Sequence, residues 1–504
     1  MEFKGGKALF CSCMFTICTA LYFIMDNIFR SLWFDEALTL SEFMIRNTIP
    51  GIYLSYEIPN NHIVFNIFLK IWMLTYEQIF GISDFSFRTF TAISSIVTLC
   101  AILILWRRHA GLIAITLTVL CFTATPAFEI YSVAIRGYIL CFLMTVLAFE
   151  SCRRLMKKFS FLNIVSFFTF CLLSVGIMPT AIIPLAAIII YFAPLHDFKK
   201  LFGRKFITAA LIPLAALIVF YLPIANKFLR IFSLNEGWEN KSAALLSTYM
   251  PFLIGMAPIL IAALIGVLTA RRNRISKITV FKFLLILSMP ACSILLANPA
   301  PFPRVFFPLW PVFLLFAAMG VRQALIQARN RSFNIYTAVI LIIILSIPAW
   351  SVIQRKYSKD LSLKCTQAGA LDDYFSPYYM NNFNPAKIAA AIKALGEDQE
   401  KTISAYVTFN ADPYSVALYG RLYNIPEDII IYDSPRRKII IKLTDLFLVI
   451  AKNEDDAAEI RKRLNLGELE LLKDCGYQNI YAEKTAAITL KEQAPSLPAQ
   501  SKSR

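Results

Sequence analysis

Two adjacent carboxylates, Asp35 and Glu36, come shortly after the first long apolar segment of the chain, at about residues 9–28. About 20 apolar residues are enough for a helix to cross the hydrocarbon core of a bilayer. Ionised side chains beside such a segment are costly to place, and they point to function. A carboxylate there can act as a general base and remove the proton of an acceptor hydroxyl. The alternative is a solvated loop rim with interfacial aromatic residues.

Three other groups of polar residues lie far apart in the sequence, at 57–62, 129–138 and 298–304. They supply further carboxylates and two arginines, and arginine binds phosphate through paired hydrogen bonds. A phosphate-linked group leaves without a general acid, so one base and these cations would suffice for group transfer. The candidate residues in these groups are Asn60, Asn61, His62, Glu129, Arg136, Tyr138 and Arg304.

These residues also have purely structural interpretations. His62 could bond to the backbone at a helix start. Arg304, among prolines and aromatic residues, could anchor a helix end by snorkelling. Glu129 could form a structural ion pair with Arg136. The functional interpretation therefore depends on whether the elements that carry these groups end at one membrane surface.

The composition indicates a polytopic membrane protein. The chain has 504 residues, of which 58% are hydrophobic and 16% are charged. In soluble proteins about a quarter of the residues are charged, so this composition excludes a soluble enzyme. A net charge of +17 could suggest a nucleic-acid partner. The positive charges instead form short runs between apolar segments, as topology signals do, and no nucleic-acid partner is expected.

Apolar segments long enough to cross a membrane predict about eleven transmembrane helices. The basic runs between them fall on one side, which is then cytoplasmic. The N-terminus is expected on that side, and Asp35 and the C-terminal region on the other side of the cell or inner membrane. The expected spans are 8–29, 87–106, 110–128, 136–152, 160–177, 179–194, 206–224, 245–270, 279–297, 304–321 and 335–352. The basic runs are 107–108, 153–154, 157–158, 199–200, 204–205, 271–272 and 322–331.

Three parts are expected along the chain: a transmembrane domain at 1–352, an extracytoplasmic α/β domain at 353–490 and a disordered tail at 491–504. The first outer loop, 30–86, contains the apolar run Ile63 to Leu74, which predicts a helix lying in the interface or, alternatively, a re-entrant helix. In the α/β domain, strands are predicted at 402–409, 428–432 and 446–451, in a partly parallel sheet. Helices are predicted at 385–395, 413–422 and 454–464, with Asp412 as an N-cap before Pro413.

The stretch Trp33-Phe-Asp-Glu-Ala37 resembles the acidic signature of the GT-C membrane glycosyltransferases. The resemblance is to the branch of protein mannosyltransferases and aminoarabinose transferases. Asn60-Asn-His62 before an apolar helix is similar to the second signature of that branch. Ser86-Phe-Arg88 and Arg136-Gly-Tyr138 also match its recurring pattern. The resemblance covers about residues 30–140 and implies a GT-C-like transmembrane domain.

The family implies a polyprenyl-phosphate sugar donor, inversion at the anomeric carbon, and an envelope glycan, lipid or protein acceptor on the non-cytoplasmic side. Carried over, Asp35 would be the base, Glu36 and Glu129 would shape the acceptor pocket, and Arg136 and Arg304 would hold the donor phosphate. The binding candidates Asn60, Asn61, His62, Arg88 and Tyr138 come from the same signatures. Ile63-Val64 replaces the usual prolines and the lysine of aminoarabinose transferases is missing, which argues against aminoarabinose as the sugar.

Two functions other than glycosyl transfer are alternatives for this sequence. A transporter or flippase of a lipid-linked glycan would place ionisable residues near the bilayer midplane and often shows repeated halves. A non-catalytic assembly partner would not need the acidic and Arg-Gly-Tyr signatures. No cofactor is expected, since no compact set of His, Cys and carboxylates appears; a divalent ion held by Asp35 and Glu129 is the alternative.

Overall fold

The computed structural model divides the chain into two compact units, residues 1–30 with 43–376 (the first unit) and residues 31–42 with 377–504 (the second unit). The expected domain ends at 352 and 490, the span at 335–352 and the tail at 491–504 lie outside the described residues. The structure describes residues 2–29, 32, 34–45, 47–54, 56, 61–80, 84–233, 245–270, 276–296, 303–329, 385–397, 403–408, 411–426, 429–431, 446–475 and 478–483.

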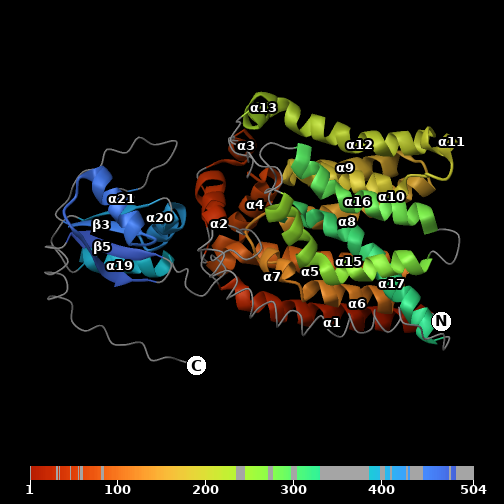
Figure 1. Ribbon diagram of the computed structural model, residues 1–504, viewed down its shortest axis with the longest axis horizontal. Coiled ribbons are helices and arrows are strands. Elements are labelled where there is room, and N and C mark those ends of the chain that lie inside the picture. Colours follow the sequence, from red (N-terminus) through yellow and green to blue (C-terminus); the bar gives the residue numbers. More distant parts are fainter. Residues whose placement is uncertain are drawn as a thin grey trace. The chain divides into compact units, whose positions relative to one another are not determined.

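The first unit is a bundle of helices (Figure 1). Its central helix is α8, whose first nine residues, 138–146, are all buried. The described helices are α1 (Glu2–Ile28), α3 (Ile49–Leu54), α4 (Ile63–Phe80), α5 (Asp84–Ala110), α6 (Leu112–Thr123), α7 (Pro126–Tyr131), α8 (Tyr138–Lys157), α9 (Phe161–Ile177), α10 (Ile182–Phe192), α11 (Phe198–Leu201), α12 (Arg204–Tyr221), α13 (Ala225–Ser233), α15 (Met250–Ala270), α16 (Ser276–Leu296) and α17 (Trp310–Arg329). Shorter 3-10 and π turns include η1 (Thr39–Ile45), η4 (Leu245–Tyr249) and η6 (Pro303–Leu309).

Every predicted span up to residue 321 contains a helix, and the apolar run from Ile63 forms α4. Among the described residues, five helical stretches are long and apolar enough to cross a membrane: Gly6–Met25, Phe85–Ala110, Arg204–Arg230, Ile278–Leu296 and Arg304–Ile326. Other predicted spans fall on shorter apolar helices such as α6, α9 and α10. The expected bundle of apolar helices is therefore present, while the number of membrane crossings, predicted as eleven, stays a prediction.

The span predicted at 110–128 is wrong in one respect, because it is two helices. Helix α6 ends at Thr123, and α7 begins at Pro126. Proline cannot continue a helix but fits its first turn. Thr125 caps α7, since its side chain accepts a hydrogen bond from Phe128 N. This break starts the polar segment that leads to Arg136.

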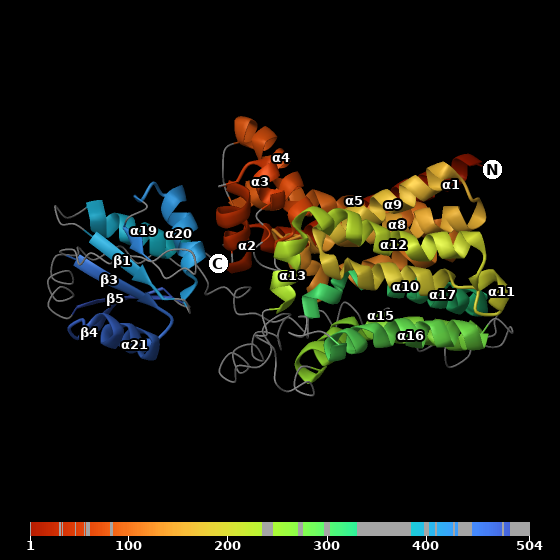
Figure 2. The same cartoon turned by 90° about the horizontal axis from the view of Figure 1, so that it is seen from above.

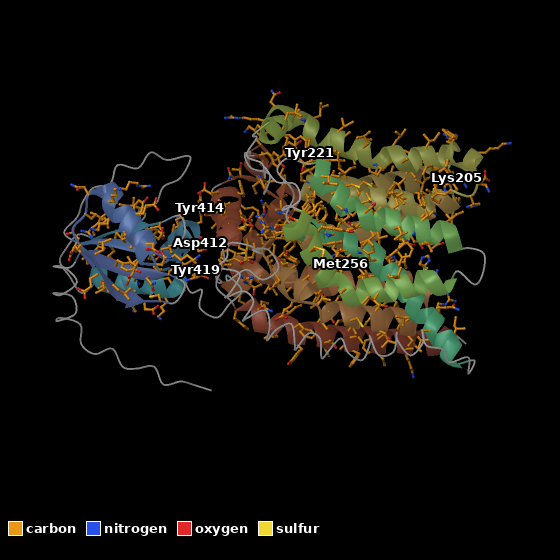
Figure 3. All side chains as sticks on the ribbon, in the orientation of Figure 1. Lys205, Tyr221, Met256, Asp412, Tyr414 and Tyr419 are labelled. Atoms are coloured by element: carbon orange, nitrogen blue, oxygen red, sulfur yellow. The ribbon has the colours of Figure 1, made fainter. Side chains whose placement is uncertain are left out.

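One end of the bundle, called the basic end below, carries the N-terminus, α11 and Lys205 (Figures 1 and 3). Lys205 Nζ lies 3.4 Å from Lys157 O, and Arg322 donates to His109 O at 3.0 Å. Glu150 accepts hydrogen bonds from Arg153 Nε at 2.7 Å and Arg154 Nε at 3.1 Å. The opposite end carries α3 and α13 (Figure 2). Because α5, α8 and α17 finish at the basic end, their first residues lie at the opposite end.

Aromatic packing fixes η6 and α17 against α6 and α8. The ring centroids of Phe122 lie 5.2 Å from Phe142 and 5.6 Å from Trp310. Phe307 of η6 packs on Phe142 at 5.3 Å and on Tyr131 at 4.9 Å. Offset and edge-on aromatic pairs add about 1 kcal/mol each to the burial of their surface. This cluster holds η6 beside the start of α8.

The second unit contains a mixed five-stranded sheet in the order β2-β1-β3-β5-β4. Strand β1 pairs in parallel with β2 and β3, whereas β5 pairs antiparallel with β3 and β4. The strands are β1 (Ile403–Val407), β2 (Ile430–Ile431), β3 (Leu446–Ala451), β4 (Leu469–Asp474) and β5 (Asn479–Glu483). The helices are α2 (Phe34–Leu38), α19 (Pro385–Glu397), α20 (Pro413–Leu422) and α21 (Glu454–Leu464). The predicted helices and the predicted parallel strands are confirmed, while β4 and β5 were not predicted.

Candidate active site

Two arginines are buried around the loop that joins α7 to α8. Arg136 is fully buried and Arg88 is 2% exposed. Arg88 Nη1 donates to Val133 O at 3.3 Å, and Ser95 Oγ donates to Ser132 O at 2.8 Å. Both bonds run from α5 to the loop. They fix the backbone that presents Arg136 at the end of the bundle opposite the basic end.

Gly137 allows His62 to reach this loop. A Cβ atom at position 137 would lie 2.7 Å from His62 Nδ1 and 2.4 Å from Ile177 Cγ2, closer than real Cβ contacts. The His62 ring also packs edge-on against Tyr138, with centroids 5.2 Å apart. The Arg-Gly-Tyr signature and the Asn-Asn-His signature are therefore brought together, with glycine at the point of close approach.

His62 is neutral at physiological pH. Burial lowers the pKa of its imidazole well below the ordinary value, and the charges of Arg136 and then Arg304 lower it further. The positive charge of this cluster is therefore carried by arginine, because guanidinium stays protonated. Among the described residues, none is placed to hydrogen-bond the buried Nδ1 atom of His62. Arg304 is 7% exposed and lies in η6.

Two pairs of polar side chains continue the cluster. Asn66 Nδ2 donates to Asn61 Oδ1 at 2.8 Å, and Asn27 Nδ2 donates to Glu129 Oε1 at 3.1 Å. Neither Asn27 nor Asn66 was singled out from the sequence. The signal was present, since each is an amide in an apolar helix, where polar groups are seldom placed without a partner. Asn60 lies outside the described residues.

The pair Asp35-Glu36 belongs to the second unit, in the short helix α2. Both carboxylates are buried, Asp35 at 6% exposure and Glu36 at 0%. Thr39 Oγ1 donates to Asp35 O at 2.7 Å and holds the turn that follows. Helix α2 packs against α20 of the C-terminal part. The sequence indicated the two acids but not the helix that contacts them.

Within the described part of the chain, no group of three or more His, Cys, Asp and Glu side chains is placed to hold a metal ion. Asp35 and Glu129, the carboxylates named for a divalent ion, belong to different units. Metal dependence stays a prediction.

The sequence matches no protein-family model and no curated protein. The structure is similar to the crystal structure of ArnT from Cupriavidus metallidurans in the apo state, with a TM-score of 0.56, 11% identity, 97% of this chain and 99% of ArnT covered. The same protein bound to undecaprenyl phosphate gives a TM-score of 0.56, 12% identity, and 94% and 98% coverage. The structure is also similar to archaeal oligosaccharyltransferase AglB from Archaeoglobus fulgidus in complex with an inhibitory peptide and a dolichol-phosphate. The TM-score is 0.52 at 12% identity, with 94% of this chain and 70% of AglB covered. The chain therefore has the GT-C membrane fold, as the signatures predicted.

Proposed function

We propose that this protein is an integral membrane glycosyltransferase. It transfers a sugar from a polyprenyl-phosphate donor to an envelope glycan, lipid or protein acceptor on the non-cytoplasmic side. The observation that carries the proposal is the cluster of Arg136, Arg304 and neutral His62, beside Arg88, at one end of a GT-C bundle. Proteins of similar fold have been solved with undecaprenyl phosphate and with a dolichol-phosphate.

The chemistry of the cluster suits a phosphate monoester or diester. Arginine meets a phosphate with two parallel hydrogen bonds. The first residues of α8 and η6 lie at a bundle end, so a phosphate bound there would sit at lipid headgroup depth with its polyprenyl tail in the bilayer. Asn61, Asn66 and Tyr138 would provide hydrogen bonds on the donor side.

In the proposed reaction Asp35 is the general base. It takes the proton of the acceptor hydroxyl while the hydroxyl oxygen forms a bond with the anomeric carbon. The bond between that carbon and the phosphate oxygen breaks, and the polyprenyl phosphate leaves with the electron pair. Arg136 and Arg304 stabilise the charge that develops on this leaving group. A single displacement inverts the anomeric carbon, and Glu36 and Glu129 would shape the acceptor pocket.

The test supplies the purified protein, in lipid nanodiscs, with either a sugar on polyprenyl monophosphate or a nucleotide sugar. Transfer should require the lipid-linked donor. Replacing Arg136 by Ala should raise the KM for that donor more than the KM for the acceptor. Arg421→Ala, on α20 of the second unit, serves as the arginine control. Efficient transfer from the nucleotide sugar alone would contradict the proposal.

Two further arms separate the remaining alternatives. A flippase would move a labelled lipid-linked glycan between leaflets of proteoliposomes without forming a new glycosidic bond. Metal dependence is tested by chelation, and we expect transfer to survive, because arginine charge can replace a cation at the phosphate. Loss of activity in chelator that Mn²⁺ or Mg²⁺ restores would show that a divalent ion is needed.

A further inference from the structure

Both backbone polar groups of Leu32, three residues before Asp35, are held by side chains of α20. Leu32 N donates to Tyr419 Oη at 3.0 Å, and Ser415 Oγ lies 3.0 Å from Leu32 O. Leu32 and Ser415 are fully buried, and Tyr419 is 3% exposed. Figure 3 labels Asp412, which caps the start of α20, and Tyr419, which lies within the helix. All of these residues belong to the second unit.

A third residue, Asp412, sets the direction of the Ser415 hydroxyl. Asp412 Oδ1 accepts from Ser415 N at 3.1 Å, which is the predicted N-cap bond. Its Oδ2 atom lies 2.7 Å from Ser415 Oγ. A serine hydroxyl has one proton, so it cannot donate to Leu32 O and to a carboxylate at once. A protonated Asp412 resolves this, because it donates to Ser415 Oγ and leaves the serine proton for Leu32 O.

The surroundings of Asp412 favour its protonated form. The residue is buried, and its backbone is left-handed with φ of 53°, an uncommon conformation for any residue but glycine. Burial raises the pKa of Asp412 to about 7, and the nearby charge of Asp35 raises it too. The hydrogen bonds from Ser415 act in the opposite direction. Asp35 on α2 is the charged group that acts on Asp412 from a neighbouring element.

We propose that Asp412, Ser415 and Tyr419 are positioning residues for Asp35. They make the C-terminal part of the chain an integral part of the catalytic segment rather than a separate cap. The inference rests on the proposed role of Asp35 as base. Helix α2 has five residues, and a helix of that length is too short to be stable by itself. The bonds to Leu32, together with the packing of α2 on α20, therefore fix where the Asp35 carboxylate points.

The first test does not need activity. Hydrogen exchange of a peptide that contains Leu32 is measured by mass spectrometry on the full-length protein, for Tyr419→Phe and Ser415→Ala. Loss of one hydrogen bond should speed exchange at Leu32 about fivefold in Tyr419→Phe. Tyr423→Phe, the residue after α20, is the matched control and should leave exchange unchanged. Unchanged exchange in Tyr419→Phe and Ser415→Ala would overturn the proposal.

The second test asks whether the geometry serves the base. Tyr419→Phe and Ser415→Ala should lower kcat about tenfold or more with little change in the donor KM, because a misplaced base slows the chemical step. Asp412→Asn keeps an acceptor and a donor toward Ser415, so it should retain most activity, whereas Asp412→Ala should not. If exchange at Leu32 rises but kcat holds, the contact is real but does not position Asp35, and the positioning proposal is wrong whatever Asp35→Asn shows. An equal fall in the Asn and Ala variants would contradict the hydrogen-bond assignment.

Discussion

At the scale of single residues, the buried charges and the glycine beside them carry the most information. Arg136 is fully buried in a loop, and a neutral His62 stands against it. Charged side chains are almost never fully buried unless they are paired or functional. The loop geometry that buries Arg136 depends on Gly137, because no other residue leaves room for the His62 ring. Two residue-level predictions follow from these contacts and from Asp35.

The first concerns Asp35→Asn. The amide is almost the same size as the carboxylate but cannot accept the proton of the acceptor hydroxyl, so we expect transfer to fall at least about 100-fold. Insertion, purification and thermal stability should stay close to those of the unchanged protein. Asp455→Asn, on the exposed first turn of α21, is the control. Near-normal turnover of Asp35→Asn would remove Asp35 from the mechanism.

The second concerns Gly137→Ala. The new Cβ would press on His62 Nδ1 and Ile177 Cγ2, so His62 or the loop must shift. Forcing an extra methyl group into a packed interior costs about 1–3 kcal/mol. We expect a lower thermal midpoint and a raised donor KM in the transfer assay. Gly6→Ala, with nothing within 4 Å of its would-be Cβ, is the matched control and should behave like the unchanged protein.

At the scale of elements, helices and strands were predictable where a local sequence pattern marks them. Helices α20 and α21 and strand β3 were predicted with the bounds that the structure has, because capping residues and apolar runs mark them in the sequence. Strands β4 and β5 were missed, and β4 has no fully buried residue to give it a strand pattern. The contact between Leu32 and Ser415 joins residues 383 positions apart. Nothing local in the sequence announces such a pairing, although the Asp412 cap was predicted.

The capping residue of α20, Asp412, also predicts that the stability of this region depends on pH. The pKa of Asp412 is about 7 in the folded chain, against an ordinary value of 3.8, so the folded form binds the proton more tightly. Unfolding of this region therefore releases a proton between those pH values. The stability contributed by protonated Asp412 is full below about pH 4 and is lost as the pH rises through about 7. At about 1.4 kcal/mol per unit of pKa difference, the loss is at most about 4 kcal/mol.

Hydrogen-exchange protection factors of α20 in the full-length protein, measured between pH 4.5 and 8.5, report this dependence. They should decrease as the pH rises towards 7 and then level off. Asp412→Asn cannot titrate, and its profile should be flat over the same range. A parallel decrease in the Asn variant would assign the dependence to another group.

At the scale of the whole molecule, the distribution of charge describes how the chain meets a bilayer. Lys157, Lys205 and Arg322 lie at the end of the bundle with the N-terminus, while His62 and Arg136 lie at the other. Charged residues of this kind stay on the cytoplasmic side during insertion. The apolar helices of the bundle were predictable because length and apolarity mark them in the sequence. The sequence did not predict which helices enclose the arginine cluster, because their arrangement depends on packing such as the aromatic contacts around Phe307.

The last prediction is the side of the membrane on which the C-terminal part lies. If the basic end is cytoplasmic, Arg136 faces the other side, and the odd number of crossings predicted from the sequence puts the second unit, with Asp35, on that side too. A reporter that is active only in the cytoplasm, fused after Lys484, should therefore be silent. The same reporter fused at residue 2 should be active and serves as the internal control. Reversal of both signals would mean that the membrane topology is inverted. The arginine cluster would then lie on the cytoplasmic side, where nucleotide sugars are made. A strong signal from the C-terminal fusion alone would require an even number of crossings, and it would separate the α20 contacts to Leu32 from a site on the non-cytoplasmic side.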